Sequence, residues 1–201
     1  MNVDPYKAPN GNVLISFSGG RTSAYMLHQI LQANGGLPDC AKVLFANTGR
    51  EMPETLDFVQ ECSQRWGVQI TWVEYVRNDN KVGCDVVSHN SASRDGEPLA
   101  SLFRSRSYLP NAVQRFCTQE TKVKTIKRHL VGQGWRQWSN TVGIRSDEAH
   151  RLKPSKDRRW VNWFPLADAG ATRQTIMSFW AKQQFDLRVT RGGGNCDGCF
   201  L

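Results

Sequence analysis

The chain has 201 residues, a formal net charge of +8 and a hydrophobic content of 39%, which excludes a disordered protein. No apolar run approaches the ~20 residues of a membrane span, and the start lacks a signal-peptide core, so we expect a cytoplasmic protein. The length fits one domain over residues 1–201, with a cysteine-containing tail at 191–201. The positive charge favours an anionic partner, either a phosphorylated small molecule or a nucleic acid.

Strand and helix signals alternate in the first third of the chain. The apolar run 13–15 predicts a buried strand, which breaks at Gly19-Gly20 into a helix that ends near Gly35-Gly36. A strand over 41–46, a helix over 53–66 and a strand over 69–76 follow. This alternation predicts an α/β fold, in which a Rossmann-like, twisted parallel sheet carries helices on both faces.

The second part of the chain is less regular. Residues 77–110 are polar and rich in Gly and Ser, which predicts a long binding loop with only a short helix around 99–103. The remaining elements, in order, are a helix that begins at its N-cap Thr118, a strand over 140–144, a basic loop over 151–159 and a helix over 172–183.

The turn after the first strand, residues 18–23, is the main candidate site, and we call it the phosphate turn. A strand that runs through two glycines into a helix offers backbone N–H groups and a positive helix end to an anion. The nucleotide-binding candidates in and beside this turn are Ser16, Ser18, Gly19, Gly20, Arg21, Thr22 and Ser23. A plain serine-rich turn is the alternative, because neither the P-loop nor the dinucleotide pattern is present.

The phosphate turn resembles the SGGxDS loop of the ATP pyrophosphatase (PP-loop, adenine nucleotide alpha hydrolase-like) superfamily, especially its phosphoadenylyl-sulfate (PAPS) reductase branch. Four further segments agree in order with that branch: NTGREMPET at 47–55, RFCTQETKVKTI at 115–126, GIRSDEAHR at 143–151 and WFPLAD at 163–168. The resemblance implies that ATP, PAPS or adenylyl sulfate (APS) binds here. It adds Asn47, Thr48, Gly49 and Arg145 to the nucleotide site, with Lys122 and Arg145 as catalytic candidates.

Two departures from the family pattern change the expected chemistry. Thr22 and Asn47 stand where relatives carry aspartate, so magnesium held directly by these side chains is disfavoured, and magnesium stays open as a cofactor. Arg21 adds a cation that can bind phosphate or sulfate oxygens with two hydrogen bonds.

Six cysteines without a secretory signal indicate thiols or metal ligands rather than disulfides. Cys40 and Cys62 are interpreted as packing residues, and Cys84 stays undecided. Cys117 directly precedes the predicted helix start, where nearby cations favour the thiolate. Cys196 and Cys199 form a CxxC pair, a spacing that lets two thiolates reach one metal.

The resemblance to cluster-bearing APS reductases implies a 4Fe–4S cluster with Cys117, Cys196 and Cys199 as ligands. Phe116 replaces the first cysteine of that family's Cys-Cys pair, which leaves one iron without a matched protein ligand. Cys84, solvent or substrate are candidates for that position. A zinc knuckle or an unligated tail is the alternative.

Three functions stay open. The leading hypothesis is ATP-dependent, iron–sulfur-assisted sulfur transfer, because no cysteine follows the CxxC pair where sulfonucleotide reductases carry their nucleophile. A PAPS or APS reductase that releases sulfite, and a non-catalytic nucleotide or cluster sensor, are the alternatives. A nucleic acid is one candidate acceptor, since basic segments 124–128 and 151–159 are interleaved with tryptophans, although core tryptophans and solvated charges explain them equally. A homodimer is left open.

Overall fold

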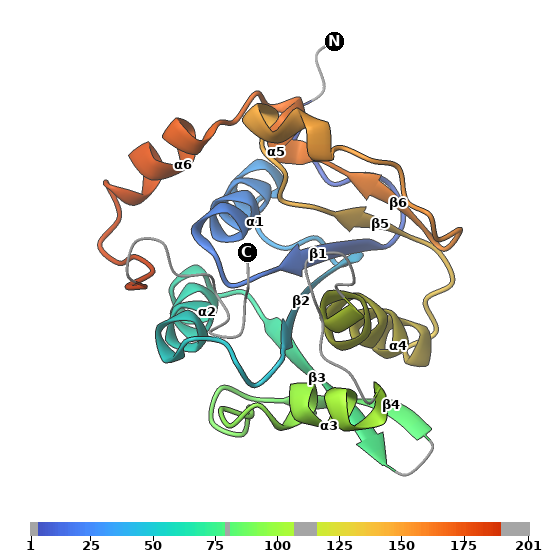
Figure 1. Cartoon of the computed structure of the whole chain (residues 1–201). Coiled ribbons are helices and arrows are strands. Elements are labelled where there is room, and N and C mark those ends of the chain that lie inside the picture. Colours follow the sequence, from blue (N-terminus) through green and yellow to red (C-terminus); the bar gives the residue numbers. More distant parts are fainter. Residues whose placement is uncertain (1–3, 79–80, 107–115, 190–201) are drawn as a thin grey trace.

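The computed structural model describes residues 4–78, 81–106 and 116–189 (Figure 1). Its six strands are β1 (Val13–Phe17), β2 (Ala41–Asn47), β3 (Ile70–Asn78), β4 (Lys81–Val87), β5 (Trp138–Thr141) and β6 (Trp160–Trp163). They form one sheet in the order β4-β3-β2-β1-β5-β6. Every neighbouring pair is parallel except β3 and β4, which pair antiparallel. The predicted α/β architecture is therefore confirmed, with one antiparallel edge strand.

Helices cover both faces of this sheet (Figure 1). The helical segments are α1 (Arg21–Asn34), α2 (Pro53–Trp66), α3 (Glu97–Arg106), the π-helical turn η1 (Thr118–Val123), α4 (Lys124–Gly132), the 3-10 turn η2 (Ser146–Arg151), α5 (Pro165–Asp168) and α6 (Arg173–Trp180). None of these helices, within the described ranges, combines the length and apolar content that crossing a bilayer requires.

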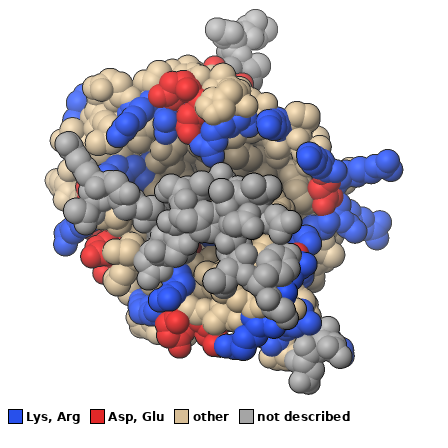
Figure 2. All heavy atoms as spheres, in the orientation of Figure 1, with Lys and Arg blue, Asp and Glu red and all other residues tan. Residues whose placement is uncertain are grey.

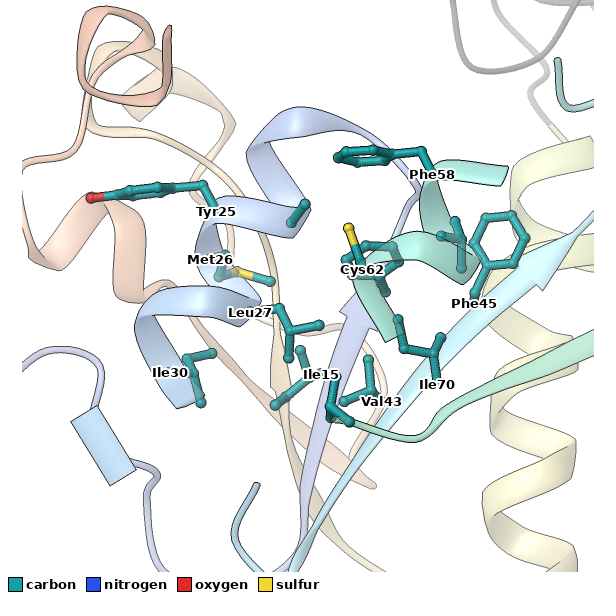
Figure 3. Packing of buried hydrophobic residues seen from close by; sticks show 14 of the residues in the cluster. Ile15, Tyr25, Met26, Leu27, Ile30, Val43, Phe45, Phe58, Cys62 and Ile70 are labelled. Carbon is teal, nitrogen blue, oxygen red and sulfur yellow. The ribbon is translucent and has the colours of Figure 1, made fainter. Parts of the chain in front are cut away.

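Alternate strand residues supply the two halves of the core. Ile15, Val43 and Ile70, from three consecutive strands, lie against Leu27 of α1 and Cys62 of α2 (Figure 3). The intervening strand residues belong to the opposite face, where Leu14, Leu44 and Val73 pack with Leu130 of α4. Because side chains alternate along a strand, two apolar faces require a nearly continuous apolar run, as the strand sequences show.

The ends of α1 and α2 lie where the sequence predicts them. Gly35 and Gly67 adopt left-handed backbone angles, with φ of 71° and 58°, and their N–H groups cap the last helical carbonyls. Pro53 occupies the first turn of α2, where its missing N–H is no loss. These local signals are strong enough to place both helices.

The segment predicted as a long loop contains two elements. Residues 81–87 form β4, and α3 extends over Glu97–Arg106 instead of the predicted 99–103. The β4 side chains are all exposed or half-buried, so the strand lacks the apolar pattern that identifies an interior strand. It is held by its backbone pairing with β3, which the sequence does not reveal.

Two further expectations near α4 were wrong. Thr118 is not an N-cap, because Phe116 and Cys117 are already helical and Thr118 lies inside the π-helical turn. The strand predicted at 140–144 lies at 138–141, and β6 was not predicted. Both strands have four residues and begin with a tryptophan, so they are too short for a periodic signal.

Candidate functional site

Three turns that are far apart in the sequence meet at the carboxyl edge of the sheet. β1, β2 and β5 are adjacent and parallel, so the phosphate turn, residues 47–51 and residues 143–145 leave the same edge. Gly143 lies against the start of α1, since a Cβ on it would sit 3.8 Å from the Cα of Ser23. The structure thus brings together the segments that carry the predicted nucleotide-binding residues.

The phosphate turn approaches α2 closely. Gly19 has a φ of +75°, and a Cβ on it would lie 2.7 Å from Thr55 Cγ2. Ser23 Oγ accepts hydrogen bonds from Ser18 N (3.2 Å) and Ser18 Oγ (3.0 Å), and donates to Gly20 O (2.9 Å). The N-cap of α1 is Gly20, no side chain of the described residues caps this end, and the first turn of α1 contains no acidic residue. The positive end of the helix is therefore available to an anion.

Arg21 is engaged by the distant residue Asp186. Its Nε and Nη2 donate to the two carboxylate oxygens at 2.6 and 2.8 Å, and Nη2 also donates to Leu187 O at 2.6 Å. Trp180 Nε1 donates to the carbonyl oxygen of Arg21 at 3.0 Å. A phosphate bound by Nε and Nη2 of Arg21 would have to displace Asp186.

Asn47, which replaces the aspartate of the family motif, is fully buried. Its Nδ2 donates to Glu74 Oε1 (2.6 Å) and to Ser93 O (2.9 Å), and its Oδ1 accepts from Gly49 N (3.1 Å). Burial raises the pKa of Glu74. An aspartate at position 47 would place a second carboxylate against Glu74, so the amide is the residue that this environment accepts.

Glu51 is a site residue that the sequence analysis missed. Its side chain is 0% exposed, and its Oε2 accepts from Thr48 N (2.8 Å) and Thr48 Oγ1 (2.7 Å). Its Oε1 accepts from Lys122 Nζ at 3.1 Å. Glu51 thereby holds the catalytic candidate Lys122, which lies on the π-helical turn, against the turn after β2. We call residues 47–51 the Asn47 turn.

The carboxylates at the Asn47 turn do not fit a magnesium site. Glu51 and Glu74 are both buried, and their oxygens already accept from amide, hydroxyl or ammonium donors. Thr22, in the first turn of α1, adds a hydroxyl instead of a carboxylate. A hard divalent cation prefers anionic oxygens that are free to coordinate it, whereas both oxygens of Glu51 and Oε1 of Glu74 already accept hydrogen bonds.

Arg145 begins the turn η2 and lies beside two carboxylates. Its Nε is 2.8 Å from Asp147 Oδ1, and its Nη1 is 3.2 Å from Glu148 Oε2. The backbone N–H of Arg173 and the guanidinium of Arg145 hold the pKa of Asp147 below its usual value. The Arg145 side chain is 19% exposed, so it is oriented by its neighbours instead of moving freely in solvent.

A pocket of about 160 Å³ opens beside the phosphate turn, and we call it the base pocket. Its walls are mainly apolar and include Leu14, Val123, Ile126, Trp138 and Trp160, and its polar rim is formed by Ser16, Ser18, Lys122, Lys127 and Asn140. The rings of Trp138 and Trp160 stack at 5.3 Å with an interplanar angle of 21°. Trp138 Nε1 is buried and has no hydrogen-bond partner within the described residues. A mainly apolar pocket with aromatic walls and several polar side chains suits an aromatic ring that carries hydrogen-bonding groups.

Of the three cysteines implied as cluster ligands, the structure describes Cys117 alone. Cys117 is partly exposed and helical, while Cys196 and Cys199 lie outside the described residues. Cys62 is buried in the core, as predicted, and burial raises the pKa of the Cys84 thiol on β4 to about 11. Within residues 4–78, 81–106 and 116–189, no three His, Cys, Asp or Glu side chains lie close enough together to hold a metal ion.

The protein-family model for the phosphoadenosine phosphosulfate reductase domain matches residues 12–186. The chain belongs to this family. The PAPS reductase family is a family of enzymes, and its model covers the phosphate turn, the Asn47 turn, Lys122 and Arg145 together.

Three individual proteins are similar to this PAPS reductase family chain. An uncharacterized nin region protein, ORF290 of Escherichia phage lambda, is 30% identical over 194 residues, which are 92% of this chain and 64% of that protein. The phosphate complex of PAPS reductase from Candida auris is 14% identical, with a TM-score of 0.53 over 90% of this chain and 79% of that one. Candida glabrata FMN adenylyltransferase with FMN and an ATP analogue is 15% identical, with a TM-score of 0.45 over 90% and 52%. The chain spans less than two thirds of the phage relative, and the Candida auris structure supports the fold alone.

Proposed function

We propose that this protein is an enzyme that binds an adenine nucleotide, with the base in the base pocket and the phosphate or sulfate groups at the phosphate turn. The observation that carries the proposal is that Ser16, Phe17 and Ser18 line the pocket and lead directly into the uncapped start of α1. One ligand that joins a flat ring to an anionic group would occupy both places. A nucleotide has that composition.

The base pocket provides the contacts that an adenine ring needs. Trp138 and Trp160 supply an aromatic wall, and Val123 and Ile126 supply the aliphatic one. Trp138 Nε1 is a donor without a partner, and Asn140 holds an amide at the rim, linked to Ser16 Oγ at 3.0 Å. Ring stacking supplies affinity, and these polar groups supply the discrimination between bases.

Lys122 and Arg145 are proposed to act on the anionic end of the nucleotide. Lys122 lines the base pocket near Ser18 and is held by the buried carboxylate of Glu51. Arg145 follows the strand next to β1 and is held by Asp147 and Glu148. Cations whose side chains are oriented in this way can stabilise negative charge that develops on a phosphoryl or sulfuryl group.

We further propose sulfur chemistry, with ATP-dependent sulfur transfer as the leading reaction and sulfite release from PAPS or APS as the alternative. Cys117 lies five residues before Lys122 in the same helical segment, which supports a thiol at the edge of the nucleotide site. Cys117, Cys196 and Cys199 would hold a 4Fe–4S cluster, which when bound could carry sulfur or orient the substrate. Magnesium would enter the site bound to the phosphates of the nucleotide. The protein would act in the cytoplasm.

Calorimetry with a nucleotide series tests the binding proposal. We expect AMP, ATP, APS or PAPS to bind, and the variant Trp160→Leu to weaken their binding about tenfold or more, while pyrophosphate binds both proteins equally. Val161→Ala is the matched control, because Val161 lies on the same strand but does not line the base pocket. Binding of pyrophosphate without any preference for adenine nucleotides would contradict the proposal.

The reaction is tested on anaerobically purified protein. Release of AMP and pyrophosphate from ATP would support ATP-dependent transfer, whereas sulfite from PAPS or APS with a dithiol reductant would establish the alternative. Iron and sulfide analysis of the parent and of Cys117→Ala tests the cluster separately. An iron content that is negligible in the parent, or unaffected by the substitution, rules out Cys117 as a ligand.

A further inference from the structure

A second depression lies at the opposite edge of the sheet from the phosphate turn. It has a volume of about 520 Å³ and is lined by residues that immediately precede or begin strands, among them Asn12, Gln137, Trp138, Arg158, Arg159 and Trp160. Because β1, β5 and β6 are parallel, these residues gather at the amino edge of the sheet. We call this depression the end groove.

Trp138 and Trp160 line the end groove, and Trp135 extends this row of rings from beside Trp138. Trp135 and Trp138 have ring centroids 6.3 Å apart, and Trp138 stacks on Trp160. Lys42 Nζ lies 5.8 Å from the Trp135 ring, and Lys127 Nζ lies 5.7 Å from the Trp160 ring. Trp135 and Trp160 are partly exposed, and Val161 beside them is 74% exposed. Aromatic rings are thus accessible between cations.

The segment that leads into β6 concentrates positive charge. Residues 151–160 contain five cations, Arg151, Lys153, Lys156, Arg158 and Arg159, and one carboxylate, Asp157, which pairs with Lys127. Lys153, Lys156 and Arg158 are exposed and form no ion pair with any residue that the structure describes. Figure 2 shows Lys and Arg side chains projecting from the right-hand edge of the molecule, beyond β5 and β6 as placed in Figure 1. Arg158 and Arg159 line the end groove, and Lys153 and Lys156 precede them in the same segment. Cations gathered in this way favour an extended anion.

We propose that the end groove binds single-stranded nucleic acid, with its phosphates on the cations of 153–159 and its bases on Trp135 and Trp160. Each part of the surface argues for this partner. A duplex conceals its base faces, an acidic peptide has no rings to stack, and a mononucleotide carries too little charge to use a whole basic segment. The end groove shares Trp138 and Trp160 with the base pocket, but its cations lie at the opposite edge of the sheet from the phosphate turn, so variants of those cations test it separately from the proposed nucleotide chemistry.

Fluorescence anisotropy of a labelled strand of about 12 nucleotides tests this on the full chain without added nucleotide. The test variant is Lys156→Gln/Arg158→Gln. The matched control is Lys7→Gln/Lys182→Gln, which removes the same charge from exposed lysines outside the groove. We expect the test variant to bind at least about tenfold more weakly at low salt, with a salt-dependence slope smaller by about 1.4, since each lost phosphate contact contributes about 0.7. The control should differ from the parent less than threefold.

Several results would overturn the proposal. Equal loss in both variants would mean that only net charge matters, and an unchanged test variant would exclude the groove. Duplex DNA or polyglutamate that competes as well as the single strand would exclude a single-stranded partner. Because stacking and phosphate contacts ignore the sugar, DNA and RNA strands should bind within about tenfold of each other. Trp135→Leu, which removes a ring that does not line the base pocket, should weaken binding while the circular dichroism of the folded chain is retained.

Discussion

The phosphate turn and the Asn47 turn lie beside each other at one edge of the sheet, but they are built in opposite ways. In the Asn47 turn, Asn47, Thr48 and Glu51 all make buried hydrogen bonds to one another or to neighbouring elements. The phosphate turn is bonded internally only through Ser18, Ser23 and Gly20, and no described side chain caps the start of α1. A turn that uses its polar groups internally acts as a support, whereas one that leaves N–H groups uncapped can bind a ligand.

The largest expected effect is on the phosphate turn itself. In Gly19→Ala the alanine must adopt a left-handed φ, and its Cβ overlaps with Thr55. We therefore expect the unfolding free energy to fall by about 3 kcal/mol or more and nucleotide binding to be lost. Gly35→Ala is the control, because Gly35 has a similar φ of +71° with nothing within 4 Å of its added Cβ. It should cost only about 1 kcal/mol. If urea unfolding gave the same loss of unfolding free energy for Gly19→Ala and Gly35→Ala, the close approach of Gly19 to Thr55 would be unimportant.

Asn47→Asp restores the family residue and tests the internal bonding of the Asn47 turn. Two buried carboxylates would then face each other, and we expect a loss of about 2–3 kcal/mol at pH 7. Glu74 already has a raised pKa, so the folded state binds its proton more tightly than the unfolded state does. The loss should therefore be small below pH 4.5 and grow as the pH rises.

The double variant Asn47→Asp/Glu74→Gln provides the control for this effect. It keeps one carboxylate at the contact and should recover most of the stability. Urea unfolding between pH 4.5 and 7.5 measures both proteins. A penalty for Asn47→Asp that is independent of pH would contradict the proposed carboxylate repulsion.

Glu51→Gln tests whether Glu51 only stabilises the Asn47 turn or also positions Lys122 for catalysis. A glutamine can still accept from Thr48 through its carbonyl oxygen, but it loses the ion pair with Lys122. We expect a cost of about 1–2 kcal/mol in stability, because a hydrogen bond to a charged group is replaced by a weaker one. Turnover should fall more than nucleotide affinity, since Lys122 is no longer held. If turnover and nucleotide affinity both stay at the parental level, Glu51 has no role in positioning Lys122.

The smallest effect concerns the pair Arg21–Asp186, which is partly exposed. Asp186→Asn should reduce the free energy of unfolding by less than about 1 kcal/mol. If Arg21 contacts the phosphate, the same change should strengthen pyrophosphate binding a few-fold, because the guanidinium no longer has to leave a carboxylate. Arg21→Gln is the companion variant, and it should weaken pyrophosphate binding. An unchanged affinity in both would place Arg21 outside the anion site.

The sequence predicts those parts of the fold that have local causes. Gly35 and Gly67 end α1 and α2, and the apolar runs of β1, β2 and β3 identify interior strands. The edge strands β4 and β6 carry no such pattern, because an edge strand needs only one neighbour and few buried side chains.

The candidate site also contains features that the local sequence predicts and features that it does not. The motifs at Gly19 and Asn47 can be recognised from residue order alone, and the fold brings them to one edge as expected. The hydrogen-bond partners of Arg21 and Asn47 cannot be recognised from residue order, because Asp186 is 165 residues from Arg21 and Glu74 is 27 residues from Asn47. No local propensity specifies such pairs, since they form only when the sheet and its helices are assembled.

The hydrogen bond from Trp180 to the carbonyl oxygen of Arg21 has a practical consequence. Trp180 is 2% exposed, and its indole contacts the backbone of Arg21, the first residue of α1, in the phosphate turn. Its emission energy depends on the local electric field, so charge arriving at the phosphate turn should change its spectrum. With the six other tryptophans as background, the difference between the parent and Trp180→Phe would give an unlabelled optical signal for occupancy of the site.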